Sequence, residues 1–133
     1  ELTRDLDLTT VFISHDLSVV QHVSDQVAVM YLGRIVELGP VAQVFGKPAH
    51  PYTDALFSSV PKLVLDADEL VRFDTIEGEV PSPLSPPSGC FFHPRCPLAT
   101  QVCSDDAPRM QSAEDKRDVA CHHFEEQLAK LSN

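Results

Sequence analysis

Apolar and polar residues follow a regular pattern over the first sixty residues of the chain. A β-branched, apolar run at residues 9–13 predicts a buried strand. Asp16 follows this run and is suited to cap a helix that carries Leu17, Val20 and Val23 on one face. The chain therefore opens with a predicted strand, a short turn and an amphipathic helix.

Two further apolar runs, residues 27–32 and 35–38, are separated by a Gly-Arg pair that begins at Gly33. A Gly-X pair between two such runs predicts a β-hairpin with a two-residue type II′ turn. Proline is tolerated where a helix begins, so Pro40 is expected in the first turn of a short helix and Pro51 at the start of another.

The periodicity weakens after residue 61. Residues 62–73 are compatible with either a helix or an acidic loop. Residues 80–89 contain four of the chain's 11 prolines and predict an extended connector. A segment with four cysteines follows, and residues 122–131 predict a short closing helix.

The composition narrows the classes of partner. The 133 residues include 10 Lys and Arg against 20 Asp and Glu, a formal net charge of −10. Such a chain argues against nucleic acid and against an anionic membrane surface as direct partners, because both would repel it. The longest apolar run is far shorter than the about 20 residues that span a bilayer. We see no signal peptide, and the start at Glu1 together with the motifs below is interpreted as a fragment.

His15 stands just past the predicted first strand, where ligands bind in open α/β sheets. An imidazole there could hydrogen-bond a phosphate oxygen or hold a water molecule for attack, and either role would serve phosphoryl transfer. The same position also suits a histidine that only caps a turn. An independent hydrolase that uses His15 and Asp16 is a weaker interpretation, because no nucleophile with a base is visible.

Four cysteines lie within a short stretch of the sequence, at Cys90, Cys96, Cys103 and Cys121. Disulfides would require an oxidising compartment, and no secretory signal supports one. Structural zinc usually has tighter C-x2–4-C pairs, whereas a 4Fe–4S cluster accepts four thiolates at wider spacing. The cysteines therefore predict a metal site at which iron–sulfur and zinc both remain open, with free buried cysteines as the remaining alternative.

The residues around the cysteines suit such a site. His93 and Arg95 are expected to donate to sulfur or to balance its charge. Phe91, Phe92 and Phe124 are expected to shield the site from water.

The sequence Thr-Val-Phe-Ile-Ser-His-Asp-Leu at residues 10–17 resembles the switch region, or H-loop, of ABC transporter ATPases, and residues 25–39 resemble the stretch that follows it. His-Pro-Tyr at 50–52 and the cysteine segment are similar to the C-terminal extension of oligopeptide, dipeptide and nickel importer ATPases. The resemblance covers nearly the whole chain.

This resemblance implies an α/β fold in two parts. Residues 1–46 would be the C-terminal end of an ABC nucleotide-binding domain, an incomplete P-loop NTPase fold with the H-loop and the following hairpin. Residues 47–133 would be the small, irregular, Cys-rich metal-binding extension of oligopeptide/dipeptide transporters, with its four-cysteine site at 90–121.

The resemblance also implies roles for individual residues. His15 would contact the γ-phosphate of ATP, and Cys90, Cys96, Cys103 and Cys121 would bind a 4Fe–4S cluster, with Zn²⁺ as the alternative. The complete subunit would hydrolyse ATP with Mg²⁺ to drive import of oligopeptides, dipeptides or related solutes such as nickel. The chain contains no G-x-x-x-x-G-K-S/T phosphate loop, no Leu-Ser-Gly-Gly-Gln signature and no acidic Walker B strand end, so this part alone is expected to be inactive.

The partners that the resemblance implies are a second ABC ATPase subunit, in a homo- or heterodimer, and transmembrane permease subunits. An extracytoplasmic peptide-binding protein would act indirectly. The subunit would then be peripheral, at the cytoplasmic face of the plasma membrane. The alternative class is a stand-alone four-cysteine metal-binding interaction module, with zinc or iron–sulfur and without ATPase activity.

Overall fold

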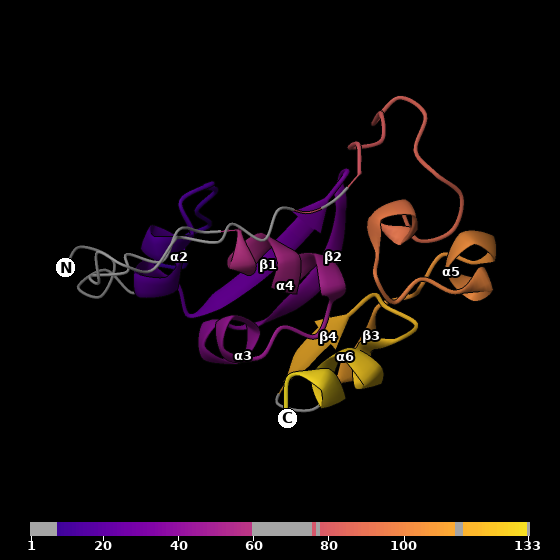
Figure 1. The fold of residues 1–133 in the computed structure, drawn as a ribbon. Coiled ribbons are helices and arrows are strands. Elements are labelled where there is room, and N and C mark those ends of the chain that lie inside the picture. The colour runs from indigo at the N-terminus through magenta and orange to yellow at the C-terminus, as the bar shows by residue number, and fades with distance from the viewer. Residues whose placement is uncertain (1–7, 60–75, 77, 114–115, 133) are drawn as a thin grey trace, which may run out of the picture.

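Strands from both halves of the chain share one antiparallel sheet. The structure is a computed structural model, and it describes residues 8–59, 76, 78–113 and 116–132. Within these residues the sheet has the strand order β1-β2-β4-β3 (Figure 1). The strands are β1 (Gln26–Tyr31), β2 (Arg34–Pro40), β3 (Gln111–Ala113) and β4 (Arg117–Val119).

The described residues also form short helices. They are α2 (Leu17–Val23), α3 (Val41–Gly46), α4 (Pro51–Ser58), α5 (Gln101–Asp105) and α6 (Phe124–Lys130), with a 3-10 helix η1 (His93–Arg95). Figure 1 shows α2 and α5 at opposite ends of the molecule. No helix in the described part of the chain has the length and apolar character needed to cross a bilayer.

The first helix forms as the sequence predicts. Asp16 caps α2, because its Oδ1 accepts hydrogen bonds from the backbone N–H of Ser18 at 3.0 Å and of Val19 at 3.2 Å. Val20 is the buried residue of this helix.

The strand predicted at residues 9–13 is wrong for this structure. The described residues before α2 contain neither helix nor strand, and Val11 and Ile13 are 91% and 94% exposed. An isolated strand leaves its backbone groups unpaired, so an apolar run becomes a strand only beside a neighbouring one. The four described strands pair with one another, and none of them pairs with this run.

The hairpin of β1 and β2 is confirmed, but its turn differs from the prediction. Tyr31 pairs with Arg34, so Leu32 and Gly33 are the central residues of the turn. Their φ angles are 44° and 79°. Positive φ at both central positions is the mark of a type I′ turn, whereas type II′ needs it only at the first.

The later helices begin close to where proline predicts. Pro51 is the first residue of α4, and His50 caps it through Nδ1, which accepts the Tyr52 N–H at 3.0 Å. Pro40 differs slightly from the prediction, because it is the N-cap of α3 and lies outside its first turn.

Downstream, residues 80–89 contain no helix or strand, as expected for a connector, and the closing helix is confirmed as α6. Residues 62–73 lie outside the described part of the chain.

The pairing of β4 with β2 is the link between the two halves. Glu37 lies opposite Val119, and Leu38 lies opposite Asp118. Gly39 permits this approach, since a Cβ at that position would lie 2.8 Å from the Cβ of Arg117. The sequence did not predict β3 or β4, because three-residue strands are too short to show an alternating pattern.

The main core joins the hairpin to the cysteine segment. It consists of Val29, Tyr31, Val36, Val44 and Phe92. The Phe92 ring lies 5.4 Å from that of Tyr31, in an edge-on arrangement. Such pairs add to the free energy of simple burial, so the segment that follows Cys90 is anchored on β1.

Candidate functional site

The structure brings the four cysteines of the predicted metal site into one region. Every pair among the four interacts electrostatically, and charge on one thiolate raises the pKa of another. Cys103 and Cys121 are buried, Cys90 and Cys96 are half-buried, and all four carry free thiols. The disulfide alternative is therefore not realised in this structure.

Each cysteine is held by a different piece of local structure. Cys90 precedes η1 and Cys96 directly follows it. Cys103 lies within the short helix α5, and Cys121 comes two residues after β4. The backbone N–H of Cys90 donates to the carbonyl oxygen of Cys103 at 2.8 Å, so the first and third cysteines are tied directly.

Gly89 makes that tie possible. Its φ is +63°, in the left-handed region that favours glycine. A Cβ on Gly89 would lie 2.3 Å from the carbonyl oxygen of Cys103, far inside van der Waals contact. Glycine is thus required here both for its backbone angle and for the close approach of the two cysteine-bearing segments.

The surroundings of Cys90, Cys96 and Cys121 favour the protonated form of these thiols. Burial is the main cause that raises the pKa of Cys96 to about 11 and the pKa of Cys121 to about 12. Repulsion from the other thiolates adds to both shifts. Burial likewise raises the pKa of Cys90. Forming thiolates here therefore costs free energy unless a positive charge binds among them.

Backbone amides act in the opposite direction. The N–H groups of Phe92, Leu98 and His123 each hydrogen-bond the sulfur of the cysteine two residues earlier, and each bond lowers the pKa of that thiol. For Cys121 the N···S distance is 3.3 Å. Amide donors aimed at three of the four sulfurs are what thiolate ligands of a metal require around them.

The charge of Arg34, which the sequence did not indicate, also acts on the cysteine site. The guanidinium of Arg34 lies 4.0 Å from the centre of the Phe91 ring, and its charge lowers the pKa of Cys90 against the larger effect of burial. Arg95 donates to the carbonyl oxygen of Ile76 at 3.1 Å. The ring of His93 places Nδ1 2.9 Å from the carbonyl oxygen of Cys90, while the backbone N–H of His93 hydrogen-bonds the Cys90 sulfur and lowers the pKa of that thiol.

A cavity of about 470 Å³ opens beside the first cysteine, between the hairpin and the cysteine segment. Its lining includes Met30, Ile35, Cys90, Phe91 and Met110. Most of this lining is apolar, so Cys90 borders a hydrophobic cavity.

The thiols do not form the site of a single metal ion. Among the residues that the structure describes, no three His, Cys, Asp or Glu side chains are arranged to hold one ion. The four-cysteine metal centre, with iron–sulfur or zinc, thus remains a prediction.

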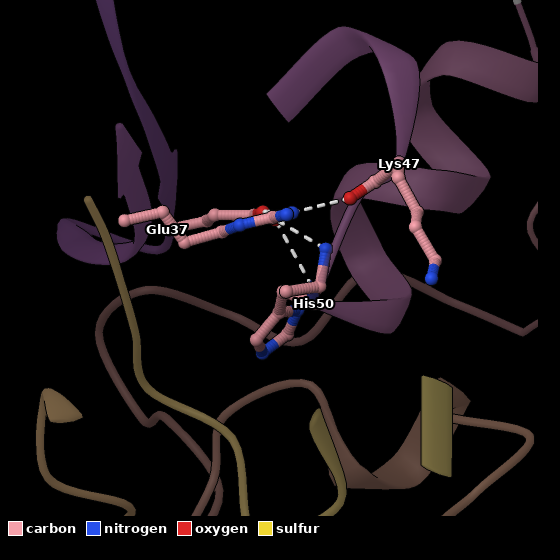
Figure 2. Close-up of polar contacts among 5 residues, drawn as sticks. Glu37, Lys47 and His50 are labelled. Carbon is pink, nitrogen blue, oxygen red and sulfur yellow. Dashed lines mark hydrogen bonds and ion pairs between the residues drawn. The ribbon is translucent and has the colours of Figure 1, made fainter. Parts of the chain in front are cut away.

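A buried carboxylate joins the hairpin to the His-Pro-Tyr segment and to β4 (Figure 2). Glu37 is fully buried, and its two oxygens accept the backbone N–H of Ala49 at 2.8 Å and of His50 at 3.0 Å. Arg117 pairs with the same carboxylate and also donates to the carbonyl oxygen of Lys47. Burial lowers the pKa of His50 to about 4, so its ring is neutral. The His-Pro-Tyr segment has a structural role here, as a cap and an anchor.

His15 lies apart from the cysteines. It is exposed and stands immediately before the cap of α2, at the end of the molecule opposite α5 (Figure 1). The neighbouring carboxylate of Asp16 is used in capping, which leaves it without the catalytic partnership that a hydrolase would need. The two predicted sites are therefore separate.

The family model and the relatives that match this chain all concern peptide transporters. The profile of a family described as "Oligopeptide/dipeptide transporter, C-terminal region" matches residues 36–103. A probable peptide ABC transporter ATP-binding protein of Sinorhizobium fredii is 52% identical over 92% of this chain and 34% of its own length. The dipeptide transport ATP-binding protein DppF of Haemophilus influenzae is 46% identical over 94% of the chain and 38% of its length. The oligopeptide transport ATP-binding protein AppF of Bacillus subtilis is 47% identical over 93% and 38%. The chain thus spans little more than a third of these relatives.

Proposed function

Because this chain belongs to the oligopeptide/dipeptide transporter C-terminal-region family, we propose that it is part of the ATP-binding subunit of an importer for oligopeptides or dipeptides. The observation that carries the proposal is the family match, which includes the His-Pro-Tyr segment and three of the four cysteines. Relatives named as peptide transport ATP-binding proteins align with more than nine-tenths of the chain. The complete subunit would hydrolyse ATP with Mg²⁺ to drive import.

His15 is proposed as the switch histidine of that subunit, at the γ-phosphate of ATP. Its ring is exposed, and it follows an apolar run whose side chains are also exposed, with Phe12 at 56% and Ile13 at 94%. In a complete nucleotide-binding domain, further strands would cover this run and convert it to a buried strand. His15 would then stand at the carboxyl end of that strand, where ligands bind in α/β sheets.

Substitution in the full-length protein tests this role. His15→Ala is expected to lower the rate of ATP hydrolysis by about 10²-fold or more, while ATP binding persists. His22→Ala is the matched control, because His22 is also exposed and its ring contacts the carbonyl oxygen of Ser18 within α2. Equal ATPase rates in the two variants would contradict a role for His15 in the reaction.

The four cysteines are proposed as ligands of a 4Fe–4S cluster. Their mutual electrostatic interaction, their burial and the amide donors at three sulfurs support this fit. Such a cluster would supply a cross-link, with four iron–sulfur bonds joining the segments around η1, α5 and β4. The residues themselves keep the thiols together, exclude water from Cys103 and Cys121, and direct N–H groups at sulfur.

Anaerobic purification of the full-length protein, followed by iron, sulfide and zinc analysis, tests the cluster. About four irons and four sulfides per chain are expected. Cys96→Ser should lose most of this iron and make the chain after residue 80 sensitive to protease. Ala99→Ser, an exposed change in the same segment, should retain both iron and protease resistance. One zinc per chain would support the alternative ion, and four free thiols without metal would remove the centre.

The proposed partners are a second ATPase subunit and transmembrane permease subunits, with an extracytoplasmic peptide-binding protein acting indirectly at the other face of the membrane. The protein would then be peripheral, at the cytoplasmic face. The rival is a four-cysteine interaction module without ATPase activity. Measurable ATP hydrolysis by the full-length protein that requires His15 would exclude that rival.

A further inference from the structure

Thr100 occupies the N-cap of α5 without acting as a cap. Its backbone is extended, as an N-cap should be, yet its side chain makes no capping hydrogen bond. A threonine at this position ordinarily accepts a backbone N–H from the first turn of the helix. Here its Oγ1 lies 2.7 Å from Nε2 of His123 and 3.8 Å from the sulfur of Cys103. The hydroxyl is thus turned away from the helix and toward the cysteine site.

His123 makes a matching contact with the other buried thiol. Its backbone N–H donates to the sulfur of Cys121 at 3.3 Å. Its ring lies between Thr100 and the exposed carboxylate of Glu126, which is 3.7 Å from Nδ1. One pair of residues therefore contacts Cys103 on one side and Cys121 on the other.

These two cysteines need such a connection more than the first two do. Cys90 and Cys96 are ordered by the local bonds of η1, in which the His93 N–H donates to Cys90 and the Cys96 N–H donates to His93. Cys103 and Cys121 come from α5 and from the residues after β4, and the hairpin of β3 and β4 separates them in sequence. Contacts between distant segments must then fix their relative position.

We propose that Thr100 and His123 form a bridge that holds the sulfurs of Cys103 and Cys121 side by side and sets their hydrogen bonding. This inference rests on the proposed cluster but concerns the chain's own residues, which would act as positioning residues through the two thiols. Hydrogen bonds to ligand sulfur raise the reduction potential of an iron–sulfur cluster, because they stabilise its more negative state. The hydroxyl of Thr100 is placed to contribute one of them.

The first test uses the full-length protein without its cluster. Brief oxidation with diamide, followed by non-reducing peptide mapping, is expected to yield Cys103–Cys121 as a major disulfide. Thr100→Val removes the hydroxyl with little change of shape and should lower that fraction about fivefold, the factor for one net hydrogen bond. Thr100→Ser should restore it. Ser104→Ala, a hydroxyl loss on the same short helix, should leave the fraction unchanged.

The second test uses the loaded protein. Thr100→Val is expected to lower the reduction potential measured by spectroelectrochemistry and to speed iron release to a chelator, whereas Thr100→Ser matches the parent. The bridge would be overturned if Thr100→Val left the fraction of Cys103–Cys121 disulfide in the cluster-free protein unchanged. It would also be overturned if Thr100→Val left the reduction potential of the loaded protein unchanged. If the parent takes up no iron, the cluster proposal fails, and the diamide experiment still decides the bridge.

Discussion

Arg117 and Glu37 form a buried ion pair between β4 and β2, with Arg117 Nη1 3.6 Å from Glu37 Oε1. The two side chains are 2% and 0% exposed, so the pair is removed from water. The same carboxylate binds the backbone N–H groups of Ala49 and His50. One buried carboxylate therefore fixes the hairpin, the His-Pro-Tyr segment and the strand that leads into Cys121.

Glu37→Gln is expected to destabilise the chain by about 3 kcal/mol, because it leaves the buried charge of Arg117 unbalanced and turns an amide N–H₂ toward backbone donors. Urea unfolding followed by circular dichroism measures the loss. Glu79→Gln, at an exposed position, is the control and should change the free energy of unfolding by less than about 0.5 kcal/mol.

A double variant measures the coupling energy between Glu37 and Arg117. Glu37→Gln combined with Arg117→Met removes both charges, so its cost should be smaller than the sum of the two single costs. Strictly additive costs would mean that the ion pair itself does not couple β4 to β2.

Gly89→Ala is expected to open the cysteine site. The new Cβ would meet the Cys103 carbonyl at 2.3 Å and break the hydrogen bond from Cys90 N–H. Gly33→Ala is the matched control, since its φ is +79° but a Cβ there meets no atom within 4 Å. The control should cost only the about 1–2 kcal/mol of the left-handed conformation. Gly89→Ala should cost more in urea unfolding, and iron content should fall in this variant alone.

Features that depend on neighbouring residues were predictable from the sequence. The cap at Asp16 and the helix start at Pro51 are set within one turn, and both are confirmed. The hairpin of β1 and β2 was also predicted, but its turn lies one residue earlier than the predicted Gly-Arg pair and has a different type. A repeated pattern or a capping residue carries this information locally.

Features that depend on distant segments were not predictable. The apolar run at residues 9–13 has the composition of a strand, yet its described surroundings offer no strand to pair with. Arg34 contacts Phe91 in the cysteine segment because the hairpin folds against that segment. No pattern in the neighbouring sequence predicts this contact. The contact between the Thr100 hydroxyl and the ring of His123 joins residues 23 positions apart, and no local pattern specifies it.

The lowered pKa of the buried His50 leads us to expect a loss of stability in mild acid. Burial lowers its pKa to about 4 in the folded chain, against about 6.5 when it is unfolded. The unfolded state therefore binds a proton more readily, and stability that is present above pH 6.5 is lost as the pH falls toward 4. The share due to His50 is about 3 kcal/mol across this window.

His50→Asn isolates that share, because asparagine keeps a capping oxygen for the Tyr52 N–H and does not titrate. Urea unfolding at pH 7 and at pH 4 should show a smaller loss in the variant than in the parent, by about 3 kcal/mol. Identical pH dependence in the two proteins would contradict a neutral, buried His50.

Cys121 should react with alkylating agents much more slowly than an ordinary thiol in the cluster-free protein. Its pKa of about 12 leaves about 10³-fold less thiolate at pH 8 than a thiol of pKa 9, and only the thiolate reacts. The labelling rate with iodoacetamide, followed by mass spectrometry, should rise about tenfold per pH unit between pH 8 and pH 10. The same thiol in urea should react rapidly at pH 8 and serves as the control. Fast labelling of native Cys121 at pH 8 would mean that its thiolate is already stable without a metal. That result would contradict the raised pKa that burial and repulsion from the other thiolates give to Cys121.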